Sequence, residues 1–505
     1  MGSFTLPSIG RFSDSYIRQF SSLDLPGLLM SITNIAVFII LALLSRIHQW
    51  RFFSEWMIII ASLLFVYWLQ PLSTIRSLEF WLPTLLILLA IVVWMIASVE
   101  SERFSNRNKL TFVICVVLIL CISSMRYLNI NFLSARINPP HMVLVLALLI
   151  GWAGLLWLLQ RIKGRNVFLG MLLIAVFLGI FIILKLPSLT GQLSILLRKW
   201  NQQSTALANA REIMWVGYSY FAFRLIHVIR EWQQGQPIKT DLAGFISFVL
   251  FFPTFIAGPI DRVDHFQKEL LNRHSQPMQN DFMIGGQRIA AGLFYKFVLA
   301  DSLALIAFTP DIVAQVNSKL WLWVIIYAYA LRLFFDFAGY THLAIGIAKL
   351  MGIRLPENFD KPYRASNLTL FWNRWHMTLT HWFRTYYFNP VTRYLRTHAS
   401  HIPAVLIIFF TQVSTMLLIG LWHGISWNFV IWGFWNGLGL FIHNRWAEWR
   451  KSRAGSLEES PLIRSGVRLF SIFFTFNFIT LGWVWFALPT PADALVTFSK
   501  LFGGV

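Results

Sequence analysis

The sequence contains few charged residues and very few cysteines. Of its 505 residues, 13% are charged, 57% are hydrophobic and two are cysteine. A composition this apolar excludes an ordinary set of soluble domains and indicates an all-α, polytopic membrane protein. Cys115 and Cys121 lie six residues apart in one apolar run, so on a helix they are separated by about 9 Å of rise and point to different sides. They cannot bridge each other, and we interpret both as packing residues.

Acidic residues are also scarce, with 22 Asp and Glu against 42 Lys and Arg, which gives a net charge of +20. Such a charge can indicate nucleic-acid binding, but here the basic residues fall mainly in short loops between apolar runs. That distribution is typical of cytoplasmic loops beside anionic lipid. We therefore expect the lipid bilayer as a partner and no nucleic acid.

Several catalytic signatures are absent. The sequence has neither a G-x-x-x-x-G-K-[ST] phosphate-binding loop nor a G-x-S-x-G nucleophile motif. No Cys or carboxylate stands at ligand spacing from the histidines near residues 376 and 381, so we expect no metal site. No internal repeat is evident, which argues against the repeated architecture of many transporters.

The first 200 residues are a series of plain apolar runs, which we interpret as an amino-terminal transmembrane module (1–200) without site residues. The first of them follows a start that lacks the features of a cleavable signal peptide, so we expect it to be retained. The first, third and fifth loops are the basic ones, which predicts that they are cytoplasmic and that the amino terminus is outside. The predicted spans are Leu28–Ser45, Trp56–Leu69, Phe80–Val99, Leu110–Met125, Met142–Gln160 and Val167–Leu186.

The character of the chain changes after Trp200, and we place a second domain at 201–505. Pro253, Gly258 and Pro259 interrupt the apolar run Phe248–Arg262 too early for a clean span, which predicts a broken or re-entrant segment buried in protein. Counting broken segments, we expect 11–14 membrane or re-entrant helices. Their location is expected to be the inner (cytoplasmic) membrane, with multiple passes.

Titratable residues gather in the stretch Phe371–Pro390, which reads FWNRWHMTLTHWFRTYYFNP. Charged and titratable groups at membrane depth are costly, so such a cluster is a functional-site hypothesis. If the stretch is one helix, His376 and His381 lie about 140° apart around it and cannot share a face. We expect His376 to line a cavity and His381 to make a structural hydrogen bond.

A third histidine, His423, lies in the apolar segment LWHGISWN beside Gly424. A neutral imidazole in an apolar cavity suits a general base that activates a hydroxyl acceptor against a thioester carbonyl. Asn373 or Arg374 could then stabilise the oxyanion. Spacing alone is equally compatible with structural packing of His423. Asp336 is either a proton-relay carboxylate or the partner of Arg332 one helical turn earlier, and we favour the pairing.

Five blocks between about Trp215 and Phe502 resemble the membrane-bound O-acyltransferase family, with the closest likeness to its bacterial branch of alginate O-acetyltransferases and teichoic-acid D-alanyl transferases. The blocks are FFPTFIAGPIDR, GLFYKFVLADSLA, FFDFAGYTHLAIGIAKLMGIRLPENFDKPYRA, FWNRWHMTLTHWFRTYYFNP and LWHGISWNFVIWGFWNG. The resemblance implies a ring of helices with a central tunnel, no bound cofactor, and an acyl thioester co-substrate (acetyl-CoA or an acyl carrier). It also implies that His423 is catalytic and that His376 is the second site position.

The resemblance predicts an acyltransferase that moves a small acyl group, acetyl, from a cytosolic thioester donor across the membrane. The acceptor is expected to be a hydroxyl of a polysaccharide or cell-wall polymer, or an extracytoplasmic acyltransferase partner. The candidate substrate-binding residues are Asn373, Arg374, Trp372, Trp422 and Asp336. Two alternatives stay open at this point: transfer of D-alanyl or another acyl group from a carrier protein, and a non-enzymatic transporter.

Overall fold

A computed structural model describes residues 31–46, 51–128, 137–161, 164, 166–274, 277–316, 318–453 and 461–503. Over these ranges the regular elements are helices, and one isolated bridge joins Ser98 and Ile238. Seven of the described helices are long and apolar enough to cross a membrane, and three shorter apolar helices accompany them. The predicted all-α, polytopic class is confirmed.

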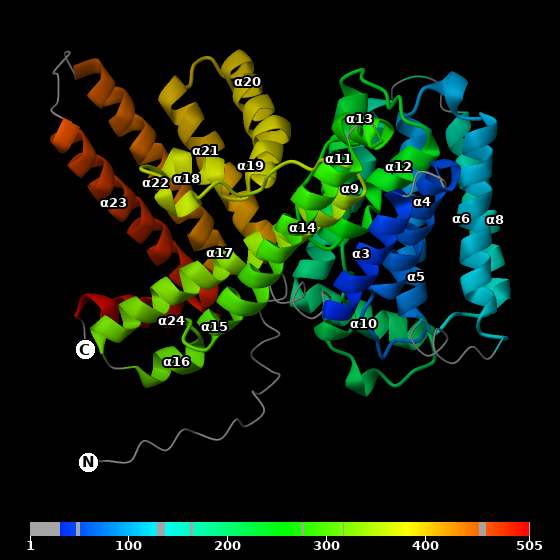
Figure 1. The fold of residues 1–505 in the computed structure, drawn as a ribbon, viewed down its shortest axis with the longest axis horizontal. Coiled ribbons are helices and arrows are strands. Elements are labelled where there is room, and N and C mark those ends of the chain that lie inside the picture. The colour runs from blue at the N-terminus through cyan, green and yellow to red at the C-terminus, as the bar shows by residue number, and fades with distance from the viewer. Residues whose placement is uncertain are drawn as a thin grey trace.

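The amino-terminal helices form one side of the molecule, on the right in Figure 1. Six of them, α3, α4, α5, α6, α8 and α9, begin and end within five residues of the predicted spans; the predicted start of the first span, Leu28, lies outside the described residues. Helix α5 is almost entirely buried among its neighbours, whereas α9 leaves most of its apolar surface exposed, as a lipid-facing helix does. The elements are α3 (Ile32–Arg46), α4 (Arg51–Trp68), α5 (Leu78–Ala97), η2 (Glu100–Glu102), α6 (Asn106–Ser124), α8 (Met142–Gln160), α9 (Val167–Lys185), α10 (Pro187–Trp200), η3 (Thr205–Leu207) and η4 (Ala210–Glu212).

The predicted break near Pro253 is present. Helix α12 (Leu242–Val249) stops early, a short turn η5 (Phe252–Thr254) follows, and regular structure resumes only at α13 (Val263–Asn272). Arg224 on α11 (Tyr218–Gln233) compensates for the break. Its guanidinium, 2% exposed, donates to the carbonyl oxygens of Phe248, Val249 and Thr254 at 2.8–3.1 Å. A charged donor thus satisfies carbonyls that have no helical partner and no access to water.

Two long elements cross the centre obliquely and join the two sides (Figure 1). The first is a continuous segment formed by α14 (Met278–Leu293), a π-helical turn η6 (Phe294–Ala300) and α15 (Asp301–Ala304). The second is the helix α17 (Lys319–Leu350), and the short helix α16 (Pro310–Gln315) lies between them in the chain. Glycines allow the close approach. A Cβ on Gly292 would lie 2.8 Å from the carbonyl oxygen of Gly339, and one on Gly346 would lie 2.9 Å from that of Gly285. Small residues at a crossing let two membrane helices pack backbone to backbone.

The carboxyl-terminal elements form the other side of the molecule. After η7 (Pro362–Arg364), the stretch expected to be one helix is divided into four pieces. The elements are α18 (Leu368–Arg374), α19 (Met377–Phe383), a π-helical turn η8 (Arg384–Phe388), α20 (Asn389–His398), α21 (Ala404–His423), α22 (Trp427–Arg453), α23 (Pro461–Ala487) and α24 (Pro491–Phe502). The helical-wheel argument for His376 and His381 therefore had a wrong premise, because the chain turns between α18 and α19.

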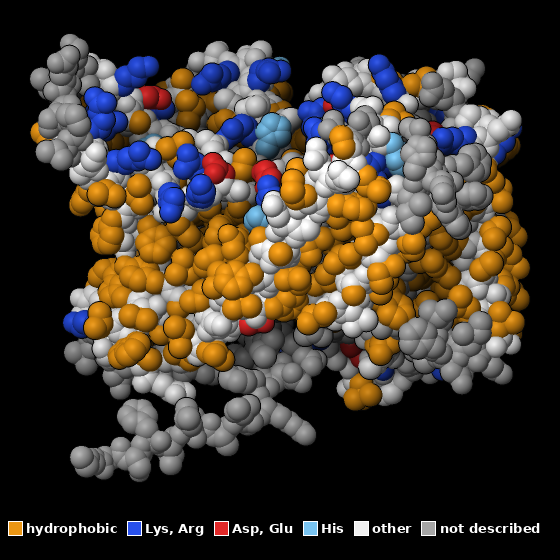
Figure 2. Space-filling model, in the orientation of Figure 1, with side chains coloured by type: hydrophobic (Ala, Val, Ile, Leu, Met, Phe, Trp, Pro, Cys, Tyr) orange, Lys and Arg blue, Asp and Glu red, His pale blue; other side chains and the backbone are white. Residues whose placement is uncertain are grey.

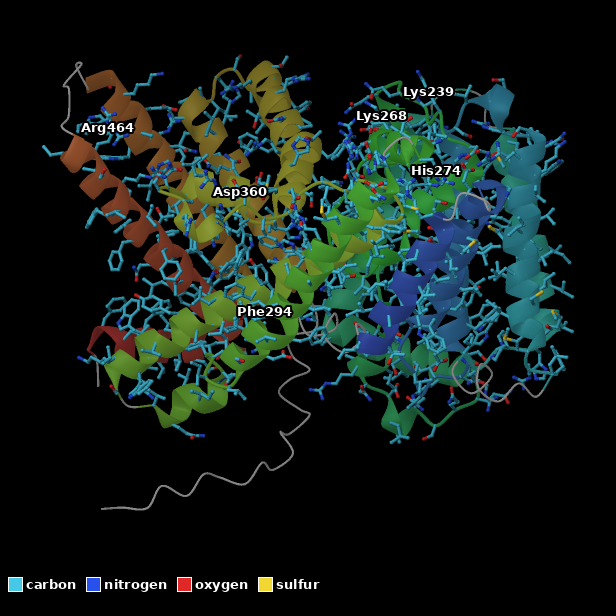
Figure 3. All side chains as sticks on the ribbon, in the orientation of Figure 1. Lys239, Lys268, His274, Phe294, Asp360 and Arg464 are labelled. Atoms are coloured by element: carbon cyan, nitrogen blue, oxygen red, sulfur yellow. The ribbon has the colours of Figure 1, made fainter. Side chains whose placement is uncertain are left out.

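The surface is banded. On the face shown in Figure 2, Lys and Arg gather along the upper rim above a broad apolar belt. Lys239, Lys268 and Arg464 lie near this upper edge in Figure 3, whereas Phe294 lies lower, within the belt. By the positive-inside rule the upper rim is predicted to face the cytoplasm. Helix α10, which follows α9, lies at the opposite edge (Figure 1).

Candidate active site

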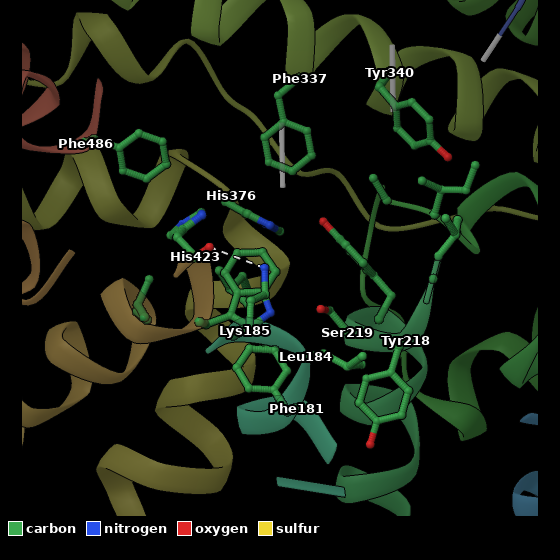
Figure 4. Close-up of a pocket in the computed structure, with 18 of the residues that line it drawn as sticks. Phe181, Leu184, Lys185, Tyr218, Ser219, Phe337, Tyr340, His376, His423 and Phe486 are labelled. Atoms are coloured by element: carbon green, nitrogen blue, oxygen red, sulfur yellow. Dashed lines mark hydrogen bonds between the residues drawn. The ribbon is translucent and has the colours of Figure 1, made fainter. Parts of the chain in front are cut away.

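Both candidate histidines line one cavity of about 190 Å³ in the middle of the protein. Its wall is contributed by the end of α9, the segment Ile213–Tyr220, α17, α18, α19, α21, α22 and α23. Figure 4 shows His376, His423 and Phe337 around the same space. The fold therefore brings together two histidines that are 47 positions apart in the sequence, as the hypothesis required.

His423 is the last residue of α21. The turn into α22 is tight, because a Cβ on Gly420 would lie only 2.3 Å from the carbonyl oxygen of Phe429. The imidazole is packed among aromatic rings, with centroid distances of 4.5 Å to Trp422 and 4.8 Å to Phe486. Within the ranges that the structure describes, no side chain hydrogen-bonds to either ring nitrogen, and Nδ1 is buried. The ring is thus held by packing and its nitrogens stay available.

His376 lies between α18 and α19 with φ 43°, in the left-handed region. A non-glycine residue adopts this conformation at a cost of about 1–3 kcal/mol, and such strain clusters at functional sites. Asn358, fully buried, holds the ring: its Oδ1 lies 3.0 Å from His376 Nδ1 and also accepts from Thr378 Oγ1 at 2.8 Å. Because a carboxamide oxygen can only accept, Nδ1 carries the proton and Nε2 is the unprotonated nitrogen.

Three of the five proposed substrate-binding residues line the cavity: Trp372, Trp422 and Asp336. The Trp422 ring lies 6.1 Å from the His376 ring and so contacts both histidines. Asp336 Oδ1 is 2.5 Å from the ammonium of Lys296 on the neighbouring η6 turn. This ion pair joins Asp336 to a partner distant in sequence, and the pairing with Arg332 that we favoured stays a prediction.

Asn373 and Arg374 do not line the cavity. Asn373 Oδ1 accepts from Arg384 Nη2 at 2.6 Å, and Arg374 Nε lies 3.6 Å from Asp360 Oδ2. Their role as oxyanion donors stays a prediction, and in the structure both side chains make contacts away from the cavity wall. The hydroxyls on the cavity wall come instead from residues such as Ser219, Tyr220, Tyr340 and Thr380.

Among the wall residues that sequence reasoning missed, one group comes from the amino-terminal side of the chain. Phe181, Leu184 and Lys185 at the end of α9 line the cavity, as does the segment from Ile213 onward. A lysine that ends an apolar helix normally indicates a side chain reaching toward the lipid headgroups, so no local signal marked Lys185. The boundary that we placed at residue 200 stays a prediction, and the cavity takes part of its wall from the amino-terminal side of it.

An ion pair outside the apolar spans anchors the segment Ile213–Tyr220. Glu212 pairs with Arg198 of α10 and also accepts from Ser194 and Thr74. The Arg198 guanidinium, followed by the two hydroxyls, lowers the pKa of Glu212 to about 2. The carboxylate is thus kept charged and fixes the start of the segment.

His381 lines a different, much smaller cavity together with His227 and Arg262. Its Nε2 lies 3.5 Å from Thr385 Oγ1 one turn later. His376 and His381 therefore face different spaces, although the reason is the chain turn and not the helical wheel. Asp261, at the edge of this second cavity, hydrogen-bonds His265 at 2.9 Å and thereby raises the pKa of His265.

Comparison with known proteins decides the class. The model of the membrane-bound O-acyltransferase family matches residues 109–485. The chain belongs to this family. It is therefore a membrane acyltransferase, and the transporter alternative is set aside.

Curated relatives of this acyltransferase act on different polymers. A teichoic acid D-alanyltransferase of Streptococcus thermophilus is 33% identical over 291 residues, which cover 54% of this chain and 68% of the relative. A probable alginate O-acetylase of Azotobacter vinelandii is 33% identical over 293 residues, covering 57% and 53%. A peptidoglycan O-acetyltransferase of Helicobacter pylori is 32% identical over 260 residues, covering 51% and 46%. The chain thus spans only about half the length of the two O-acetyl-transferring relatives.

Proposed function

We propose that this chain transfers an acetyl group from a cytosolic thioester to a hydroxyl of a cell-surface polysaccharide, or to an extracytoplasmic partner that passes it on, in the cytoplasmic membrane. The observation that carries the proposal is the convergence of His376 and His423 on one largely aromatic cavity. A cavity of this size suits a small acyl group together with the reacting end of an acceptor. The volume of about 190 Å³ is below the ~300–1,000 Å³ typical of clefts for drug-sized ligands.

In the proposed reaction, His423 accepts the proton of the acceptor hydroxyl as its oxygen attacks the thioester carbonyl. The tetrahedral intermediate collapses, the carbon–sulfur bond breaks, and the thiolate leaves with the proton that the imidazole returns. The products are the acyl ester and the free thiol. The aromatic packing of His423 fixes its ring without using its nitrogens, which suits a base whose partner is the substrate.

His376 is proposed to position the acceptor or the thioester. Its Nδ1–H is committed to Asn358, and its Nε2 is buried without a partner. An unpaired buried acceptor costs about 1–3 kcal/mol, and a cost of this kind at a cavity wall is consistent with a group that hydrogen-bonds substrate during turnover.

A D-alanyl donor is the second candidate, and relatives with that name support it. The cavity favours acetyl, because the D-alanyl group carries an ammonium and the wall already holds the ammonium of Lys185. Two such charges about 6 Å apart repel by roughly 3 kcal/mol at an effective dielectric constant of 20.

His423→Ala tests the proposal directly. With purified protein in lipid nanodiscs, radiolabelled acetyl-CoA and extracted surface polysaccharide, the variant should lose acyl transfer by about 10²-fold or more at unchanged membrane abundance. His398→Ala is the matched control, because His398 is exposed on α20 and remote from the cavity lining. A fully active His423→Ala protein would refute the assignment. Mass spectrometry of the polymer identifies the acyl group.

A further inference from the structure

Among the described residues that line the cavity, Lys185 is the one Lys or Arg. It ends α9 and is half-buried, and its Nζ lies 3.3 Å from the backbone carbonyl oxygen of His423. Figure 4 draws this contact beside the two histidines. A residue of the amino-terminal helices is thus in direct contact with the proposed general base.

The charge of Lys185 is not neutralised by a carboxylate. No Asp or Glu in the described ranges forms an ion pair with it, and the one acidic residue of the cavity wall, Asp336, is already paired with Lys296. Lys296 itself is not on the wall. Lys296 neutralises the charge of Asp336 from outside the cavity wall. The ammonium of Lys185 is therefore the net charge that the cavity presents to a ligand.

The contact with His423 leaves this ammonium with binding capacity. Lys185 carries three N–H donors, and the carbonyl oxygen accepts one of them. The carboxyl end of α21 offers only about half an elementary negative charge. It therefore neutralises the positive charge of Lys185 only in part. Two donors and a fractional positive charge remain next to the reacting centre.

From this arrangement we propose that Lys185 binds an anionic group of the acceptor, a carboxylate or a phosphodiester, and so places a neighbouring hydroxyl against His423. The inference rests on the proposed function, because it names the chemical class of the acceptor. Lysine acts as a compact point charge, so both anions fit the same position. Lys185 is the last residue of α9 and is followed by α10. Helix α10 lies at the edge opposite the basic rim (Figure 1), which is the side an extracytoplasmic polymer would reach.

Binding can be measured without turnover, because several tryptophans line the cavity and their fluorescence reports occupancy. The probes are a hexamer of uronic acid, a short poly(glycerol phosphate) chain and a neutral hexamer of N-acetylglucosamine. Lys185→Gln should weaken the preferred anionic probe by about tenfold or more and leave the neutral probe unchanged. Lys185→Arg should retain most of the affinity. Preference for the uronate assigns a carboxylate acceptor, and preference for the glycerol phosphate assigns a phosphodiester.

Lys500→Gln is the matched control, because Lys500 Nζ also donates to a backbone carbonyl, that of Val313, at 3.3 Å, but lies outside the cavity. Equal affinity of wild type and Lys185→Gln for every anionic probe would overturn the proposal, as would an equal loss in Lys500→Gln. If Lys185→Gln does not fold, the comparison of wild type with Lys185→Arg across salt concentrations replaces it: binding that is insensitive to salt contradicts an anion site.

Failure of this inference and failure of the proposed function give different results. His423→Ala should bind the anionic probes as wild type does while transferring no acyl group. Wild-type protein that binds anions through Lys185 but acylates no polymer would remove the proposed function and keep the anion site. If Lys185→Gln changes neither kcat nor KM for an anionic acceptor, the anion site is removed and the proposed function is kept.

Discussion

Asn358 is the residue through which the orientation of His376 can be tested. It is fully buried, and its Oδ1 is the acceptor for His376 Nδ1 at 3.0 Å and for Thr378 Oγ1 at 2.8 Å. Leucine has a similar volume but accepts no hydrogen bond. Asn358→Leu therefore removes the group that fixes the imidazole tautomer and leaves the packing volume nearly constant.

The expected magnitude follows from these contacts. A third donor to the same oxygen is the backbone N–H of Thr378, at 3.3 Å, so the variant leaves three buried donors without this acceptor. At about 1–3 kcal/mol each, they lower the free energy of unfolding by roughly 3–9 kcal/mol. The hydrogen bond that orients the ring is worth about 1–1.5 kcal/mol, so kcat should fall by about tenfold for the protein that remains folded. Asn358→Asp keeps the acceptor, so it should retain the fold. Its charge favours the imidazolium form of His376, which moves the acid limb of the pH–rate profile to higher pH.

The assay is initial-rate acetyl transfer from labelled acetyl-CoA, normalised to folded protein by size-exclusion chromatography, with thermal unfolding measured in parallel. Asn108→Leu is the control, because Asn108 is also buried and its Oδ1 accepts from the backbone of Leu242, between α6 and α12. It should lower stability without lowering kcat. Wild-type kcat in Asn358→Leu, or an equal loss of kcat in both variants, would refute the reasoning.

Two further predictions concern the scaffold. Gly339→Ala should destabilise the protein by about 1–3 kcal/mol, because its Cβ would lie 2.8 Å from the backbone nitrogen of Lys296. The control is Gly286→Ala, on an open face of α14 with nothing within 4 Å, which should be neutral or stabilising. Similar unfolding temperatures for both variants would contradict the argument that glycines allow the two helices to cross closely. The lowered pKa of Glu212 means that its stabilisation is complete above about pH 4.5 and is lost as pH falls toward 2. Glu212→Gln should therefore flatten the decline of unfolding temperature over that range, and an unchanged decline would exclude this ion pair as its source.

The sequence was a sufficient guide to most helices and to the break near Pro253. Apolar runs of bilayer length and interrupting prolines are local signals, and Met142–Gln160 was predicted to the residue. The local signal failed where the backbone depends on distant partners. His376 adopts φ 43° between two short helices, and Asn358, which binds its ring from 18 positions away, lies in the loop between α17 and η7.

By itself, then, the sequence determined the membrane class, most of the spans and the two candidate histidines, because these depend on composition, on period and on residue identity. Only the tertiary structure decided which side chains meet. It placed His376 and His423 on one cavity, moved Asn373 and Arg374 away from it, paired Asp336 with Lys296, and brought Lys185 to His423. The physical reason is that most of these contacts join segments far apart in the chain, and the packing of helices across the core sets such contacts.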